Sequence, residues 1–184
     1  EFLNAEAGDK VLSIAENEKV NFVAVDKIGL YKKDDSYLQK HIEAVLDYDL
    51  VDVEAIKKAK FKIVLDPINS SGAIYIPALL KALGVKEVVV INEVVNGKFE
   101  HNPEPLPKNL IGLSSEVVKQ KASLGIAVDP DVDRLCFVCE DGSMFGEEYT
   151  LVAVADYILK NRKGNSVSNM SSTKSLKEIT QQHG

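Results

Sequence analysis

Short apolar runs alternate with stretches of helical periodicity through the middle of this chain, and this alternation restricts its fold. The apolar runs are Phe61–Leu65, Val88–Ile91 and Leu124–Val128, each short enough to be a buried strand. Helical periodicity separates them, over Ile74–Leu83 and over Leu110–Gln120. Alternating strands and helices predict a mainly parallel sheet with helices on both faces. The sequence therefore predicts a three-layer α/β domain.

A fourth apolar run, Leu135–Glu140, follows the third after only a short acidic loop. Parallel neighbours need a crossover of about a dozen residues or more. This run should therefore pair antiparallel with the strand before it, which makes the predicted sheet mixed.

Two charged or polar segments, Lys32–Asp35 and Arg162–Asn165, are the candidate domain boundaries. We expect residues 35–161 to form a complete domain, with residues 1–34 and 162–184 belonging to neighbouring domains. Because the chain starts without Met before a helix and stops at a plausible helix cap, we interpret it as an excised fragment. Periodicity predicts further helices at Ala5–Asn17, Ser36–Leu46, Asp52–Ala59, Glu147–Asn161 and Thr173–His183. Val20–Val25 alternates loosely and leads into an extended or irregular connection, and Val167–Met170 is a candidate strand that opens the next domain.

The net charge of the chain limits the kinds of molecule that it is expected to bind. The formal net charge is -6 and the isoelectric point is near 5.2. Both values argue against binding to nucleic acid or to an anionic membrane, which attract clustered Lys and Arg. No apolar stretch approaches the roughly 20 residues that span a bilayer, and the amino end lacks the features of a signal peptide. We therefore expect a cytoplasmic protein with a small-molecule partner.

The loop after the third predicted strand carries carboxylates at alternate positions, Asp129, Asp131 and Asp133, followed by Arg134. Two carboxylates about 4 Å apart repel by roughly 4 kcal/mol at an effective dielectric constant near 20. A hard divalent cation such as Mg²⁺ or Ca²⁺ removes this cost, because it takes oxygen ligands. The spacing therefore predicts a cation site.

Two known kinds of acidic loop are alternative interpretations of this segment. An EF-hand calcium loop needs Gly at the sixth position, where this chain has Arg134, and needs a helix before Asp129. A phosphatase of the haloacid-dehalogenase type would use Asp129 as its nucleophile, with Asp131 as acid and base. That motif normally opens a domain and leads into a crossover, whereas here a hairpin strand follows. The phosphatase is the alternative function that we retain.

A third interpretation comes from the segment Leu124–Leu135, which reads LGIAVDPDVDRL and resembles the metal-binding loop of the α-D-phosphohexomutase superfamily. This superfamily contains phosphoglucomutases and phosphomannomutases. Other segments resemble it in the expected order: FKIVLDPINSSGA, ALLKALG, NGKFEHNPEPLPKNL, EDGSMFGEE and SVSNMSSTKSLKEITQQHG. The resemblance covers nearly the whole chain and is centred on the second, metal-binding domain of the family.

The resemblance implies a role for each residue of the loop. Asp129, Asp131 and Asp133 would hold Mg²⁺ together with the phosphate of a phosphoserine, and Arg134 would contact the same phosphoryl group. Val132 departs from the family, which often has Gly or Ala at this position.

The resemblance also implies an activity for the full enzyme, and it implies that some residues needed for that activity lie outside this chain. The full enzyme would be an isomerase that moves a phosphoryl group reversibly on a hexose phosphate, through a phosphoserine and a bisphosphorylated sugar. Residues 1–34 would be the tail of the first domain, and residues 162–184 the start of the third. The phosphoserine would precede Glu1 and the sugar-binding residues would follow Gly184, so we expect the fragment alone to be inactive.

Three other features favour structural roles. Cys136 and Cys139 should face opposite sides of a strand and remain reduced thiols. The segment Asn69–Gly72 should form a strand-to-helix turn with a Ser cap. His101, in a Pro-rich loop, is also expected to be structural.

Overall fold

The structure is a computed structural model that describes residues 3–17 and 21–184, and it separates into two units, residues 1–35 and 36–184. The first unit contains helix α1 (Ala5–Glu16) and the 3-10 turn η1 (Val25–Lys27). The side chain of Asn4 caps α1 by accepting a hydrogen bond from Ala7 N at 2.8 Å. The loosely alternating segment Val20–Val25 forms no strand over its described part, residues 21–25.

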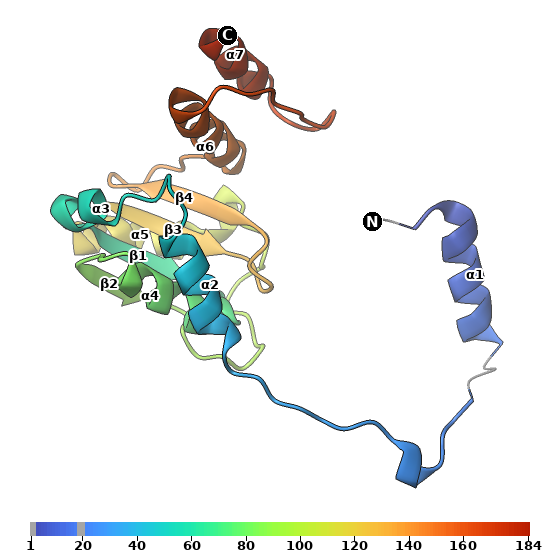
Figure 1. The fold of residues 1–184 in the computed structure, drawn as a ribbon. Coiled ribbons are helices and arrows are strands. Elements are labelled where there is room, and N and C mark those ends of the chain that lie inside the picture. The colour runs from blue at the N-terminus through green and yellow to red at the C-terminus, as the bar shows by residue number, and fades with distance from the viewer. Residues whose placement is uncertain (1–2, 18–20) are drawn as a thin grey trace. The chain divides into compact units, whose positions relative to one another are not determined.

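A four-stranded sheet lies at the centre of the second unit (Figure 1). Its strands are β1 (Lys62–Asp66), β2 (Glu87–Val90), β3 (Leu124–Val128) and β4 (Leu135–Cys139), in the order β2-β1-β3-β4. Strand β1 pairs parallel with β2 and β3, whereas β3 and β4 pair antiparallel. The predicted mixed α/β sheet, including its antiparallel last strand, is confirmed.

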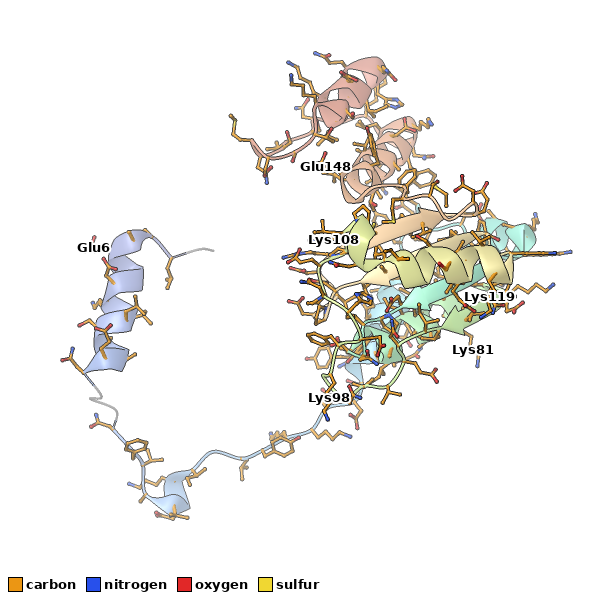
Figure 2. All side chains as sticks on the ribbon, turned by 180° about the vertical axis from the view of Figure 1, so that it is seen from behind. Glu6, Lys81, Lys98, Lys108, Lys119 and Glu148 are labelled. Atoms are coloured by element: carbon orange, nitrogen blue, oxygen red, sulfur yellow. The ribbon has the colours of Figure 1, made fainter. Side chains whose placement is uncertain are left out.

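Helices cover both faces of this sheet because successive residues of the central strands point to opposite sides. On one face, Leu65 and Ile126 pack with Leu80 of helix α4 (Gly72–Ala82). On the other face, Val64 packs with Val117 of helix α5 (Ile111–Gln120). The remaining elements are α2 (Tyr37–Leu46), α3 (Val53–Ala59), η2 (Pro107–Asn109), α6 (Glu147–Asn161) and α7 (Lys174–His183). Lys81 on α4 and Lys119 on α5 keep their side chains on the outside of the layers (Figure 2).

Gly125 explains how closely α5 approaches the sheet. A Cβ atom at this position would lie 2.7 Å from Val117 Cγ2 and 3.1 Å from Val138 Cβ. Such distances are shorter than van der Waals contact, so a larger residue would push the helix away from β3.

Helices α6 and α7 pack against each other at the carboxyl end of the chain (Figure 1). The strand predicted at Val167–Met170 is wrong, because this segment is irregular and the side chains of Val167 and Met170 are fully exposed. A short strand is stable only beside another strand, and none in the described residues pairs with it. In the described part of the chain, no helix combines the length and apolar character needed to cross a membrane.

Candidate functional site

The candidate site lies at the edge of the sheet where β1, β2 and β3 end. Parallel strands end at the same edge, so the loops that follow them meet there. Residues 67–71 follow β1, residues 91–106 follow β2, and residues 129–134 follow β3. We call the last segment the acidic loop.

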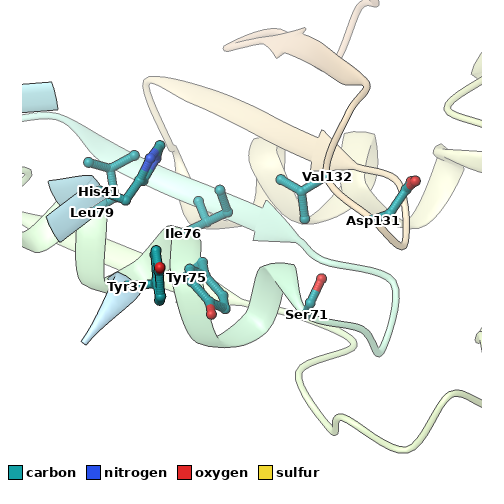
Figure 3. A pocket seen from close by; sticks show the side chains of 8 residues that line it. All are labelled: Tyr37, His41, Ser71, Tyr75, Ile76, Leu79, Asp131 and Val132. Carbon is teal, nitrogen blue, oxygen red and sulfur yellow. The ribbon is translucent and has the colours of Figure 1, made fainter. Parts of the chain in front are cut away.

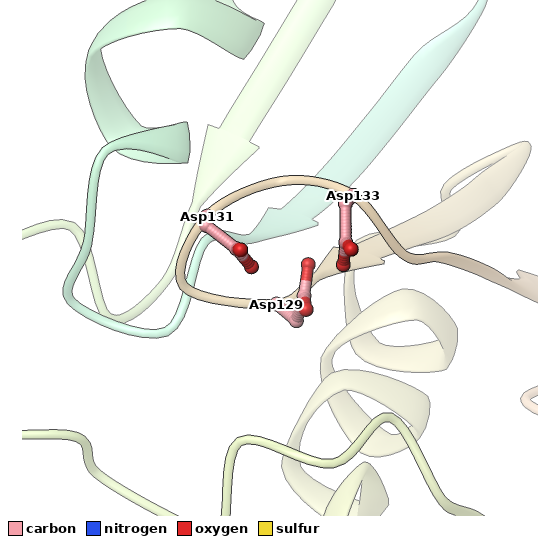
Figure 4. Close-up of side chains that lie close together, drawn as sticks. All are labelled: Asp129, Asp131 and Asp133. Atoms are coloured by element: carbon pink, nitrogen blue, oxygen red, sulfur yellow. The ribbon is translucent and has the colours of Figure 1, made fainter. Parts of the chain in front are cut away.

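The acidic loop brings its aspartates together, as the sequence predicted. One carboxylate oxygen from each of Asp129, Asp131 and Asp133 lies within 4.8 Å of the others. Figure 4 shows the side chains pointing toward a common point inside the loop. Asp129 is buried, whereas Asp131 and Asp133 are exposed to solvent. A cation held here would therefore have protein ligands on one side and be accessible to solvent on the other.

The electrostatics of the loop favour a bound cation. The neighbouring carboxylate of Asp129, followed by the charge of Asp131, raises the pKa of Asp133. Burial opposes ionisation of Asp129, but hydrogen bonds, first from the backbone of Arg134, outweigh burial and lower the pKa of Asp129. Three clustered oxygen donors of this kind match the preference of a hard divalent ion, which would remove the repulsion that raises the pKa of Asp133.

Arg134 lies beside the aspartates and is held from two directions. Its backbone N–H donates to Asp129 Oδ1 at 3.0 Å, and its Nη1 donates to Glu104 Oε2 at 2.6 Å. Its Nε lies 3.8 Å from Asp129 Oδ2 and 4.0 Å from Asp133 Oδ1. The Glu104 carboxylate raises the pKa of Arg134 further. Sequence reasoning missed Glu104, since nothing in its Pro-rich loop indicated that this acidic residue would meet Arg134.

Two serines after β1 hold the acidic loop in place. The hydroxyls of Ser70 and Ser71 both donate to the carbonyl oxygen of Pro130, at 2.7 Å and 2.9 Å. Ser71 occupies the N-cap position of α4, but its side chain makes no capping hydrogen bond there. The expected strand-to-helix turn therefore forms, and its hydroxyls bind the neighbouring loop instead of capping the helix.

Removing both hydroxyls should weaken divalent-metal binding by about 10- to 100-fold, the usual range for groups that orient metal ligands. Ser70→Ala or Ser71→Ala alone should have a smaller effect, because the other serine still donates to Pro130. Isothermal titration calorimetry of each variant with Mg²⁺ measures the affinities. Ser166→Ala is a matched control, since its hydroxyl bonds to Thr180 rather than to the loop. Unchanged affinity in the double variant would contradict this role.

The three loops contain unusual backbone conformations. Of the six non-glycine residues with positive φ in the described part of the chain, four lie here: Ile68, Asn69, Asn92 and Val132. Val132 has φ of 63°, in the left-handed region that β-branched residues rarely adopt. Glycine adopts this conformation without steric cost, whereas Val does not. In this chain the Val132 side chain packs against the apolar cluster of α4 and β3.

A cavity of about 550 Å³ opens beside the acidic loop. Figure 3 shows its lining side chains, which come from α2, from α4 and its N-cap, and from the acidic loop: Tyr37, His41, Ser71, Tyr75, Ile76, Leu79, Asp131 and Val132. The cavity is therefore partly aromatic, with an acidic residue at one end.

The structure gives no support to the two competing loop types. The acidic loop lies between β3 and the antiparallel β4, so no helix precedes it as in an EF-hand. No crossover follows it, as the phosphatase motif would need.

Comparison with known proteins agrees with this geometry. The family model described as phosphoglucomutase/phosphomannomutase, alpha/beta/alpha domain II, matches residues 35–142. A phosphoglucomutase/phosphomannomutase of Thermococcus kodakarensis is 37% identical over 161 residues, covering 86% of this chain and 34% of the relative. A phosphoglucosamine/phosphogalactosamine mutase of Sulfurisphaera tokodaii is 35% identical over 112 residues, covering 60% of this chain and 24% of the relative.

Solved structures show the same fold. A phosphoglucomutase/phosphomannomutase family protein from Burkholderia thailandensis superposes with a TM-score of 0.79 at 24% identity, covering 99% of this chain and 38% of that one. The chain spans about a third of the length of the curated relatives that it matches.

Proposed function

Because this chain belongs to the phosphoglucomutase/phosphomannomutase family, we propose that it provides the metal-binding part of an enzyme that moves a phosphoryl group on a hexose phosphate. The observation that carries this proposal is the convergence of three carboxylates at the edge of the sheet, directly beside Arg134. The enzyme is an isomerase in this proposal, acts in the cytoplasm, and has a hexose phosphate as its partner.

In this proposal Asp129, Asp131 and Asp133 hold Mg²⁺. When bound, Mg²⁺ neutralises negative charge on the phosphoryl oxygens and so stabilises the transition state of phosphoryl transfer. Ser70 and Ser71 orient the loop that carries the ligands.

Arg134 is the second contact to the phosphoryl group in this proposal. Its side chain is 44% exposed, and only one of its terminal nitrogens is bonded to Glu104. Its Nε lies 3.8 Å from Asp129 and 4.0 Å from Asp133, beyond hydrogen-bond distance. The N–H groups not bonded to Glu104 can therefore donate to phosphoryl oxygens, and the planar guanidinium suits two oxygens of one phosphate. Glu104 limits the orientations that this side chain adopts.

The proposed reaction proceeds through a phosphoserine and a bisphosphorylated sugar. The serine phosphate is transferred to one hydroxyl of the sugar, and the phosphate at the other end of the sugar then returns to the serine. Residues 35–161 form the metal-binding domain, residues 1–34 the tail of the domain before it, and residues 162–184 the start of the domain after it. The start of the family match at residue 35 supports the first boundary. The serine lies outside this chain, so the chain alone has no turnover.

The decisive experiment measures conversion of glucose 1-phosphate and mannose 1-phosphate by the full-length protein. Chelation of divalent metal should abolish turnover and Mg²⁺ should restore it, whereas this chain alone should show none. Hydrolysis of a generic phosphate ester to inorganic phosphate, abolished by Asp129→Asn, would instead favour the phosphatase.

The affinity of the chain for Mg²⁺ should fall as the pH is lowered. The pKa of Asp133 is raised, so its carboxylate takes up a proton at a higher pH than an ordinary aspartate does. Metal ligands must be deprotonated, and binding is therefore complete above this pKa and is lost as the pH falls through it. Calorimetry at a series of pH values, from neutral pH down to the ordinary aspartate pKa of about 3.9, measures the effect. In Asp133→Asn the affinity should be lower and its pH dependence weaker; an unchanged pH dependence would show that another group titrates.

A further inference from the structure

Asp66, the last residue of β1, is a buried carboxylate that connects the loops of the site. Its side chain is 2% exposed and lies outside the acidic loop. Its Oδ1 accepts hydrogen bonds from Ile68 N and from Asn92 Nδ2, both at 3.0 Å. Its Oδ2 lies 2.9 Å from His101 Nε2. A buried carboxylate is costly unless such donors surround it, so Asp66 holds these groups in place.

His101 is the donor that comes from farthest along the chain. Its Nδ1 lies 2.8 Å from the carbonyl oxygen of the next residue, Asn102, so both ring nitrogens face oxygen atoms. Its side chain is 23% exposed, although the loop around it, residues 91–106, is mostly open to solvent. Together with Asn69, whose Oδ1 accepts a hydrogen bond from Glu100 N at 3.1 Å, His101 therefore fixes the 91–106 loop to the residues at the end of β1 and just after it.

Glu104 follows His101 by three residues, and short hydrogen bonds hold the backbone between them. Asn102 Oδ1 accepts a hydrogen bond from Glu104 N at 3.0 Å. The Glu104 carbonyl accepts one from Asn109 Nδ2 at 2.8 Å. The side chain of Glu104 then bonds to Arg134. The position of Glu104, and through it that of Arg134, thus depends on where His101 fixes the loop.

We propose that His101, paired with Asp66, is a positioning residue that places Glu104 so that Arg134 is held toward the phosphoryl group. This inference rests on the proposed function, because it assumes that Arg134 contacts phosphate. It does not require His101 to touch the substrate.

The test uses the full-length protein that carries this chain. His101→Phe keeps a ring but removes both ring nitrogens, and should lower kcat by about 10- to 100-fold with little change in KM, as expected for a group that orients another. His101→Gln keeps an amide N–H for Asp66 and should recover most of the activity. If His101 acts through Glu104, His101→Phe should add little to the loss already caused by Glu104→Ala.

The matched control is His183→Phe, because His183 also pairs with an aspartate, Asp156, and is 22% exposed, but lies on α7. It should leave kcat within about threefold of the parent. Unchanged kcat in His101→Phe, no recovery in His101→Gln, or fully additive losses with Glu104→Ala would each overturn the inference.

Limited proteolysis separates this inference from the proposed function. Lys98 is exposed in the 91–106 loop (Figure 2), and trypsin should cut after it several-fold faster in His101→Phe than in the parent. If the full-length parent has no mutase turnover, the proposed function fails, whereas equal cleavage rates refute the role of His101 in fixing the loop.

Discussion

Replacing Asp131 with asparagine is expected to lower the turnover of the full-length enzyme by about 100-fold or more while leaving the domain folded. Asp131 is exposed at the open side of the acidic loop, so the change creates no cavity. The pKa of Asp133 is raised first by its hydrogen bond with Asp129 and then by the charge of Asp131. The change removes that second charge from the cluster, and the fold therefore loses little. The affinity for the proposed Mg²⁺ should fall instead, because the ion loses an anionic ligand.

Steady-state assays with glucose 1-phosphate and titration of the variant with Mg²⁺ measure this effect. Asp141→Asn is a suitable control, because Asp141 is an exposed aspartate at the opposite end of β4 from the acidic loop. It should behave like the parent in both measurements. Unchanged activity in Asp131→Asn would rule Asp131 out as a metal ligand.

Replacing Leu65 with alanine is expected to destabilise the domain by about 2 to 5 kcal/mol. Leu65 is fully buried in the central strand β1, where it packs with Leu80 of α4 and with Ile126 and Val128 of β3. Truncation would leave a cavity between the sheet and the helix layer, which the paired strands cannot close without breaking their register.

Urea denaturation followed by circular dichroism measures this loss. Leu135→Ala is the matched control, because Leu135 is 37% exposed at the start of β4. This change should cost clearly less than Leu65→Ala, since more than a third of the Leu135 surface is already in contact with water, whereas Leu65 is fully buried. A loss of similar size in both variants would contradict the assignment of Leu65 to the core.

Local patterns along the chain were sufficient to predict the sheet and the clustered carboxylates of the acidic loop. Strand and helix periodicities act over a few residues, so Leu124–Val128 and Leu135–Cys139 could be recognised directly. The loop of only six residues between them required antiparallel pairing, which the structure has. The alternate spacing of the aspartates also lies within one loop. Their convergence follows from a turn that joins two paired strands.

The hydrogen bonds and ion pairs that hold the site in place could be found only in the tertiary structure, because each joins residues far apart in the sequence. Glu104 bonds to Arg134 across 30 positions, His101 to Asp66 across 35, and Ser70 to the Pro130 carbonyl across 60. No periodicity links such pairs. They meet because parallel strands bring the ends of β1, β2 and β3 to one edge of the sheet. The sequence by itself therefore determined the fold class and the cluster of carboxylates, whereas the packing of three loops decided which side chains hold that cluster in place.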